Sequence, residues 1–208
     1  MDPKHTLDTY PFKTRPFAHQ YATLDNSWMR KNFALHLEMG LGKSRITIDT
    51  LGMLWLNDRV THALVIAPAG VYRNWIKEFD KHLPDMVQIN LHAWNKMTSK
   101  REQAEFDELL KDESGAMQIL LMNVEALSSA KGVKYAKEFL SKIPGPSAMV
   151  IDESSTIKNR TARRTKSAIA LGKLADYRRV LSGLPTPNSP IDLFAPFQFL
   201  SGNEVNLL

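Results

Sequence analysis

The residues best suited to chemistry lie in one short segment, 38–44, which reads Glu-Met-Gly-Leu-Gly-Lys-Ser. It follows an apolar run and precedes an amphipathic stretch, which is the context that a phosphate-binding loop requires. Gly40 and Gly42 let the backbone bend so that successive N–H groups face phosphate oxygens, and the positive end of the following helix adds to the attraction. Lys43 can reach the β- and γ-phosphates, and the Ser44 hydroxyl can bind Mg²⁺.

One position departs from the strict phosphate-loop pattern G-x-x-x-x-G-K-[ST]. The pattern requires glycine where this chain has Leu37. The alternative interpretation is a glycine-rich turn between a strand and a helix that binds no ligand. The Gly-x-Gly-Lys-Ser run in this setting favours the phosphate loop.

A second group is the pair of adjacent carboxylates Asp152 and Glu153, which follows the apolar run 148–151. Sheets of α/β proteins bind ligands at the carboxyl ends of their strands. Asp152 could hold Mg²⁺, partly through water, and Glu153 could orient and deprotonate an attacking water. Many loops begin with carboxylates for solvation alone, but the pair is a strong signal downstream of a phosphate loop. A water-activating glutamate favours hydrolysis over phosphoryl transfer to a small acceptor.

Short apolar runs alternate with amphipathic stretches along the chain. Such runs suit the central strands of a parallel sheet that helices cover on both faces. The predicted strands are 33–37, 63–67, 88–91, 118–122, 148–151 and 179–182. The predicted helices are 44–56, 100–111, 135–142 and 162–174. This alternation predicts an α/β fold with a mainly parallel sheet flanked by helices on both faces.

Length and composition indicate one domain over residues 1–208. The chain is 43% hydrophobic and 24% charged, which excludes a disordered tail. The absence of cysteine excludes a disulfide scaffold, a cysteine nucleophile and a thiolate zinc site. The net charge of +5 permits an acidic partner such as nucleic acid.

We find neither a signal peptide nor a membrane-spanning run, so we expect a cytoplasmic protein with access to DNA, in the host cytoplasm if it is viral. Whether residues 1–14 are flexible or pack on the domain is left open.

Several motifs in order resemble the first RecA-like domain of a superfamily 2 helicase, most closely the Swi/Snf-type double-stranded DNA translocases. The matching segments are 15–20 (the upstream glutamine motif), 38–44 (motif I), 67–75 (motif Ia), 122–125 (motif Ib), 152–155 with 157–159 (motif II and its extension) and 181–188 (motif III). The order and spacing of these motifs are far more specific than any one of them. The resemblance implies a RecA-like P-loop domain that uses ATP and Mg²⁺.

The resemblance also implies roles for individual residues. In the glutamine motif, Gln20 would read the adenine edge. The expected catalytic residues are Lys43, Asp152 and Glu153, and Ser44 with Asp152 would hold Mg²⁺. The residues expected to bind ATP are Arg15, Gln20, Met39, Gly40, Leu41, Gly42, Lys43 and Ser44.

Nucleic-acid contacts are expected from motifs Ia and Ib and the extension of motif II. The candidates are Gly70, Arg73, Asn74, Asn123 and Lys158. Backbone N–H groups and short polar side chains of this kind suit phosphate contacts without base reading. The segment 158–179 adds many cations against the single acid Asp176, either as a phosphate-binding cluster or as a solvated helix face. Trp75 is expected in the core rather than as a stacking platform.

Two motifs depart from the pattern of the family. Motif II usually closes with histidine where this chain has Ser155, and motif III commonly has threonine where this chain has Leu184. The contacts that couple ATP to motif III must therefore differ. We expect Ser155, Ser182 and Gly183 to take part in them.

The leading hypothesis is a motor domain that couples ATP hydrolysis to movement on nucleic acid, with double-stranded DNA as the expected partner. The resemblance implies a second RecA-like domain that supplies an arginine for the transition state, so this chain by itself is expected to hydrolyse ATP slowly. One alternative is a module that binds nucleic acid or protein in an ATP-dependent way without translocation. A phosphoryl-transfer enzyme is the weaker alternative, since no acceptor pocket is evident. The motifs leave open whether a duplex is opened.

Overall fold

Six parallel strands form one sheet in the computed structural model, which describes residues 3–94, 99–111, 114–183 and 190–202. The strand order is β1-β6-β5-β2-β4-β3. The strands are β1 (Asn32–His36), β2 (His62–Ala67), β3 (Ile89–Ala93), β4 (Met117–Asn123), β5 (Ser147–Ile151) and β6 (Tyr177–Ser182). All six predicted strands are present, and the predicted α/β fold with a parallel sheet is confirmed.

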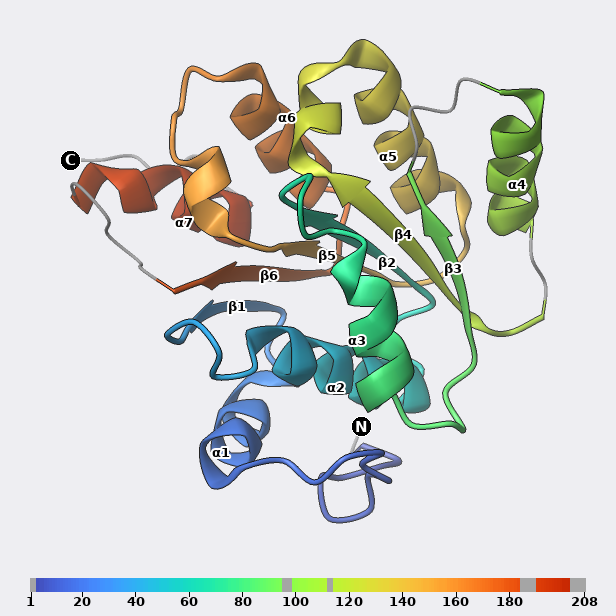
Figure 1. Ribbon diagram of the computed structural model, residues 1–208, viewed down its shortest axis with the longest axis vertical. Coiled ribbons are helices and arrows are strands. Elements are labelled where there is room, and N and C mark those ends of the chain that lie inside the picture. Colours follow the sequence, from blue (N-terminus) through green and yellow to red (C-terminus); the bar gives the residue numbers. More distant parts are fainter. Residues whose placement is uncertain (1–2, 95–98, 112–113, 184–189, 203–208) are drawn as a thin grey trace.

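Helices cover both faces of this sheet (Figure 1). On one face lie α1 (Ala18–Ser27), α2 (Lys43–Leu56) and α3 (Asn74–His82), with α1 packed against α2. On the other face lie α4 (Lys100–Lys111), α5 (Ala130–Lys142), α6 (Arg163–Gly172) and α7 (Phe194–Ser201). Three short 3₁₀ segments complete the described elements: η1 (Val124–Ser128), η2 (Ser154–Ile157) and η3 (Pro190–Leu193).

The apolar periodicity of the sequence predicted α2, α4, α5 and α6 but not α1, α3 and α7. In α3 the buried residues Trp75, Phe79 and His82 follow the i, i+4, i+7 spacing of a helix, which is a signal that was available. Helix α7 is short, almost entirely apolar and carries Pro196 in its first turn, so its pattern does not distinguish a helix from a buried strand.

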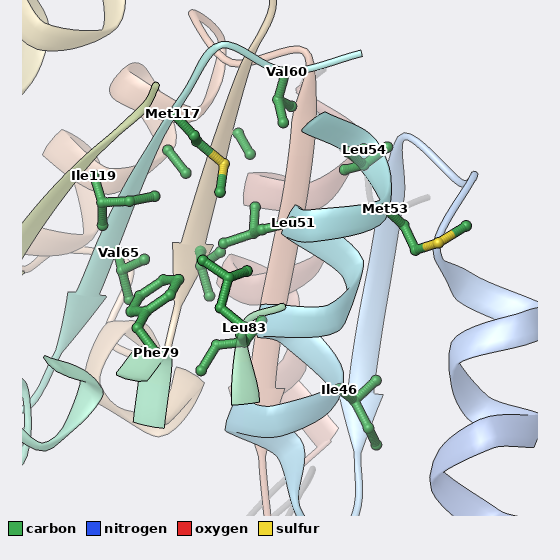
Figure 2. Packing of buried hydrophobic residues seen from close by; sticks show 14 of the residues in the cluster. Ile46, Leu51, Met53, Leu54, Val60, Val65, Phe79, Leu83, Met117 and Ile119 are labelled. Atoms are coloured by element: carbon green, nitrogen blue, oxygen red, sulfur yellow. The ribbon is translucent and has the colours of Figure 1, made fainter. Parts of the chain in front are cut away.

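Alternate strand residues build a separate hydrophobic core on each face. In β2, where every residue is buried, Ala63 and Val65 belong to one core, and Leu64 belongs to the other. This is the two-residue period expected of a strand that is covered on both sides. Figure 2 shows the first core, where Leu51 of α2 and Phe79 of α3 lie against the strands.

The N-terminal segment packs on α2. Leu7 and Tyr10 are buried, and the backbone N–H of His5 donates to Asn57 Oδ1 at 2.9 Å. A side chain at Gly52 would overlap the hydroxyl of Tyr10, so the glycine makes room for this segment. The described residues 3–14 are therefore part of the domain.

The strand order decides which loops meet at the carboxyl edge of the sheet. Strands β1 and β5 flank β6, and β5 pairs with β2 with Ile66 opposite Ile151. The loops after β1, β2, β5 and β6 consequently leave the sheet side by side. Motifs that are far apart in the sequence thus share one edge.

Across the described ranges, none of the helices combines the length and apolar character needed to span a membrane.

Candidate functional site

The loop that joins β1 to α2 has the backbone geometry of an anion site. Gly40 and Gly42 both have left-handed backbones, with φ values of 82° and 86°. Gly42 caps α2, and a side chain there would overlap Gln20 Nε2, so both its conformation and its surroundings require glycine. The first N–H groups of α2 have no partner within the helix and can bind an anion together with the helix dipole.

Lys43 lies across this loop rather than pointing into solvent. Its Nζ donates to the carbonyl oxygens of Leu37 at 2.9 Å and Glu38 at 3.1 Å. A bound phosphate would compete with these carbonyls for the ammonium group. Met39 and Leu41, the other loop residues expected at ATP, are exposed.

A cavity of about 370 Å³ joins the loop to the end of β5. Gly40, Gly42, Lys43 and Ser44 line it on one side, and Asp152 lies on the other. The residues of motif Ia and α3 that complete the wall are Val71, Asn74, Trp75 and Glu78. The structure therefore brings the phosphate loop and Asp152 into one cavity, whereas Glu153, the next residue along the chain, is not among the residues that line it.

Asp152 is held at the wall of this cavity. Its backbone N–H donates to the carbonyl of Ile66 at 2.7 Å, and its Oδ2 accepts a hydrogen bond from Trp75 Nε1 at 3.0 Å. Burial raises the pKa of Asp152, while the Trp75 bond and the nearby Lys43 lower it. A divalent cation beside this carboxyl group would favour its ionised form. Trp75 is buried, as expected, and it also orients an acidic residue, which the sequence analysis missed.

Glu153 adopts a left-handed backbone conformation, with φ 53° and ψ 73°, at the start of η2. Such a conformation is strained for a residue with a β-carbon and is more common at functional sites than elsewhere. The side chain is half-buried.

The oxygen ligands of this cavity suit Mg²⁺. Ser44 supplies a hydroxyl and Asp152 a carboxylate, and hard divalent cations prefer oxygen ligands, with water completing the shell.

The start of motif III touches the phosphate loop. The carbonyl of the buried Ser182 accepts a hydrogen bond from the N–H of Leu37 at 3.2 Å. A side chain at Gly183 would lie 3.4 Å from Met39 Cγ. Ser155 is half-buried in η2, and its carbonyl accepts from the N–H of Lys158. Leu184 and the rest of motif III, up to Asn188, lie outside the described residues.

Gln20 is buried at the N-terminal end of α1 beside the phosphate loop. Its Nε2 donates to the carbonyl of Leu41 at 3.2 Å. Its Oε1 accepts from the guanidinium group of Arg45 at 3.2 Å. The Arg15 side chain is exposed, and its backbone carbonyl also accepts from Arg45, at 2.8 Å. Arg45 was not predicted, although Arg45 and Asp49 form a charged pair at positions i and i+4 in a helix whose only other charged residue is Lys43.

The residues expected to contact nucleic acid follow the carboxyl ends of β2, β4 and β5, but they differ in exposure and in the partners of their side chains. Gly70 is exposed, and Arg73 is exposed with its Nε donating to the Tyr72 hydroxyl at 3.0 Å. Asn74 lines the cavity of the phosphate loop.

The other two candidates have protein partners. Asn123 caps η1 by accepting from the N–H of Ala126 at 2.9 Å, and Lys158 forms an ion pair with Asp192 at 3.4 Å. The assignment of these five residues to nucleic acid stays a prediction.

The basic segment 158–179 does not form one phosphate-binding surface. Arg179 is buried and donates to backbone carbonyls, so the expectation that it could contact phosphates is wrong. Arg178 is half-buried, and Arg160 stacks on the ring of Phe194 at 3.8 Å from its centroid. The exposed Lys166 and Lys173 line a groove of about 670 Å³ along α6.

Comparison with known proteins identifies the class of domain to which this fold and site belong. Residues 24–206 match the SNF2-related domain, and the chain belongs to this family. It is 30% identical over 175 residues to the human DNA excision repair protein ERCC-6-like and 28% identical over 167 residues to the ATP-dependent helicase FUN30 of Saccharomyces cerevisiae. These alignments cover 82% and 80% of this chain but only 13% and 14% of the relatives, so the chain spans about one seventh of their length.

Two solved structures share the fold. The Sulfolobus solfataricus SWI2/SNF2 ATPase core in complex with dsDNA superposes with a TM-score of 0.69 at 23% identity, over 95% of this chain and 38% of that one. The UvsW helicase of bacteriophage T4 superposes with a TM-score of 0.61 at 17% identity, over 90% of this chain and 58% of that one.

Proposed function

We propose that this domain binds and hydrolyses ATP as part of a motor that moves on double-stranded DNA. One observation carries the proposal: Lys43 and Ser44 of the phosphate loop line the same cavity as Asp152. Membership in the SNF2-related family supports it, since relatives in that family are named ATP-dependent helicases. A solved SWI2/SNF2 core of the same fold is bound to dsDNA.

The chemistry follows from the positions of the side chains. The N–H groups at the start of α2 and Lys43 bind the phosphates, and Lys43 exchanges the carbonyls of Leu37 and Glu38 for phosphate oxygens. Ser44 and Asp152 would hold Mg²⁺, which when bound neutralises charge on the phosphates. The Glu153 carboxylate accepts a proton from water as the water oxygen attacks the γ-phosphorus. The bond between that phosphorus and the bridging oxygen breaks, which leaves ADP and phosphate.

The contact of Ser182 and Gly183 with the phosphate loop offers a path by which a conformational change at the bound nucleotide reaches motif III. Because the N–H of Leu37 is bonded to the Ser182 carbonyl, a change in the loop on phosphate release displaces the start of motif III. We propose that a second RecA-like domain reads this change and completes the site with an arginine.

The test is ATP binding and phosphate release by the 208-residue chain, with and without double-stranded DNA. We expect Lys43→Ala to weaken ATP binding at least tenfold and Lys137→Ala, which removes an exposed lysine of α5, to leave it unchanged. Glu153→Gln should keep ATP binding and abolish turnover. Unaltered ATP binding by Lys43→Ala would refute the assignment of the cavity.

The same assay tests the need for a second domain. We expect the 208-residue chain to bind ATP and turn it over slowly, because the arginine that the proposed second domain would supply is typically worth at least about a thousandfold in rate. Strong DNA-stimulated turnover that both Lys43→Ala and Glu153→Gln abolish would contradict this part of the proposal. DNA binding that responds to ATP without turnover or movement would instead support a binding module.

A further inference from the structure

Trp75, in the first turn of α3, belongs to the hydrophobic core and to the phosphate-loop cavity at once. Its ring is buried in the core that α2 and α3 form with the sheet, and it packs on Phe79 with 6.1 Å between the ring centroids. Its indole Nε1–H donates to Asp152 Oδ2 at 3.0 Å, and both residues line the cavity. One side chain thus connects the packing of the core to an acidic group of the site.

The core fixes the direction of this donor before any ligand binds. Trp75 is 2% exposed, and Phe79 beside it lies among the closely packed side chains of the same core (Figure 2). Close packing holds an aromatic ring in one rotamer. An indole nitrogen can only donate, and a buried indole N–H needs an acceptor. The structure supplies the carboxylate of Asp152 as that acceptor.

The backbone of Asp152 does not by itself orient the carboxylate. Its N–H donates to the carbonyl of Ile66 at 2.7 Å, which places the residue at the end of β5. The last torsion of an aspartate side chain is broad, so the plane of the carboxylate depends on what its oxygens contact. The bond from Trp75 engages Oδ2 and sets this plane. Because the indole is neutral, the carboxylate keeps its full charge for a cation.

This contact separates two contributions to nucleotide binding. Lys43 and the first N–H groups of α2 can bind phosphate oxygens without any contribution from Trp75. The Mg²⁺ of a nucleotide complex depends on Asp152, and groups that orient a metal ligand are typically worth about 10- to 100-fold in metal affinity. Loss of the indole N–H should therefore weaken only the part of nucleotide binding that requires Mg²⁺.

We propose that Trp75 is a positioning residue that orients the Asp152 carboxylate for Mg²⁺ and so determines how strongly the cation tightens nucleotide binding. This inference rests on the proposed nucleotide site at the phosphate loop. It concerns the metal and is independent of movement on DNA.

The experiment measures dissociation constants of the 208-residue chain for AMP-PNP, a non-hydrolysable ATP analogue, in excess Mg²⁺ and in EDTA. We expect the wild type to bind more tightly in Mg²⁺. Trp75→Phe should reduce the ratio of the two constants at least about fivefold and leave the constant in EDTA unchanged. The matched control is Trp94→Phe, because Trp94 is buried in the core on the other face, 5.3 Å from Tyr135 between ring centroids. It should leave both constants unchanged.

The contrary outcomes are distinct. An unchanged ratio in folded Trp75→Phe, or equal weakening in Mg²⁺ and in EDTA, would overturn the inference, since equal weakening indicates a structural role alone. Equal wild-type binding in Mg²⁺ and EDTA would overturn it while the nucleotide site stands. Absence of any AMP-PNP binding that depends on Lys43 would refute the site and this inference with it.

A double-mutant cycle tests whether Trp75 acts through Asp152. In the Asp152→Ala background the carboxylate is gone, so adding Trp75→Phe should cause no further change in the ratio of the two constants. A further loss of the same size as in the wild-type background would show that Trp75 acts without Asp152 and would overturn its role as a positioning residue.

A spectrum of the wild type covers the case in which Trp75→Phe does not fold. The chain has four tryptophans, so the indole N–H signal of Trp75 can be assigned by replacing the other three in turn, with Trp28→Phe, Trp55→Phe and Trp94→Phe. We expect the Trp75 signal to move when Mg²⁺ is added to the chain with AMP-PNP, because a cation on the carboxylate weakens the hydrogen bond. The signal of Trp94 should stay in place. A Trp75 signal that does not move at saturating Mg²⁺ would overturn the inference.

Discussion

Helix α1 is anchored at both ends by a buried arginine, and the two arginines bind differently. At the N-terminal end, Arg45 contacts Gln20 and pairs with Asp49. At the C-terminal end, Arg179 of β6 donates to the carbonyls of Ser27, Trp28, Arg30, Lys31 and Arg178. In the described part of the chain, no carboxylate forms an ion pair with Arg179.

The difference shows that two buried arginines, one from α2 and one from β6, hold the two ends of α1 for different purposes. Arg179 lies at the negative end of the α1 dipole, where carbonyl oxygens solvate a cation. Burial lowers its pKa only to about 10, so it stays charged at neutral pH. Arg45 has a carboxylate partner that titrates, and it lies next to the phosphate loop. The anchor at the amino edge of the sheet therefore concerns stability alone, while the anchor at the carboxyl edge links stability to the site.

The largest expected effect is at the amino edge. Arg179→Met leaves several buried carbonyls without a donor, and we expect a loss of about 3 to 4 kcal/mol in the free energy of unfolding, measured by urea denaturation. Arg178→Met is the matched control in the same strand, since the half-buried Arg178 bonds through Nε to Asn32, and it should cost about 1 kcal/mol. In conditions where Arg179→Met is folded, its ATP affinity should equal that of the wild type. A lower ATP affinity of folded Arg179→Met would contradict the inference that Arg179 affects stability alone.

A smaller effect concerns the pH dependence at the carboxyl edge. Burial raises the pKa of Asp49 from 3.8 to about 7, against the opposing influence of Arg45 and a hydrogen bond with Tyr10. The folded state therefore holds this proton more tightly than the unfolded chain, so the stabilisation is complete below pH 4 and is lost as pH rises through 7.

We expect the wild type to lose about 2 to 3 kcal/mol relative to Asp49→Asn between pH 5 and pH 8. Urea denaturation of both proteins at several pH values checks this. Arg179→Met should show no such difference in slope from the wild type, because Arg179 does not titrate in this range. Parallel pH profiles for the wild type and Asp49→Asn would contradict the assignment.

The smallest effect compares two strained backbones, one at each edge. Glu153 at the carboxyl edge and Asp58 at the amino edge have φ values of 53° and 54°. Aspartate tolerates this region better than glutamate, so Glu153→Gly should raise the free energy of unfolding by about 0.5 to 1 kcal/mol, and Asp58→Gly should change it by less. Only Glu153→Gly should also abolish ATP turnover. Equal turnover in both variants would contradict the role of the Glu153 carboxylate as the proton acceptor.

Local patterns predicted most of the elements that surround the site. The six strands are evident from short apolar runs, and α2, α4, α5 and α6 follow from amphipathic spacing. The glycines of the phosphate loop were identifiable because their left-handed conformations suit that residue type. Helices α1 and α7 were missed because α1 lacks a clear apolar stripe and α7 is apolar all round.

The contacts between side chains within the site could not be predicted from local sequence patterns. That Trp75 bonds to Asp152, and that Asn74 lines the cavity rather than a separate face, follows from the pairing of β2 with β5. Arg179 looked like one more cation in a basic run, and only its place on β6 beneath α1 buries it.

The sequence by itself determined the class of fold and the positions of the glycine-rich loop before α2 and of the acidic pair after β5, because these depend on residue types within a few positions of one another. The tertiary structure decided which loops meet at the carboxyl edge and how Arg45 holds Gln20. Those features depend on the order of the strands and on hydrogen bonds between residues far apart in the chain, such as that of Trp75 with Asp152, 77 positions away. The periodicity of a chain records which face of an element is buried, but it does not record which element packs against that face.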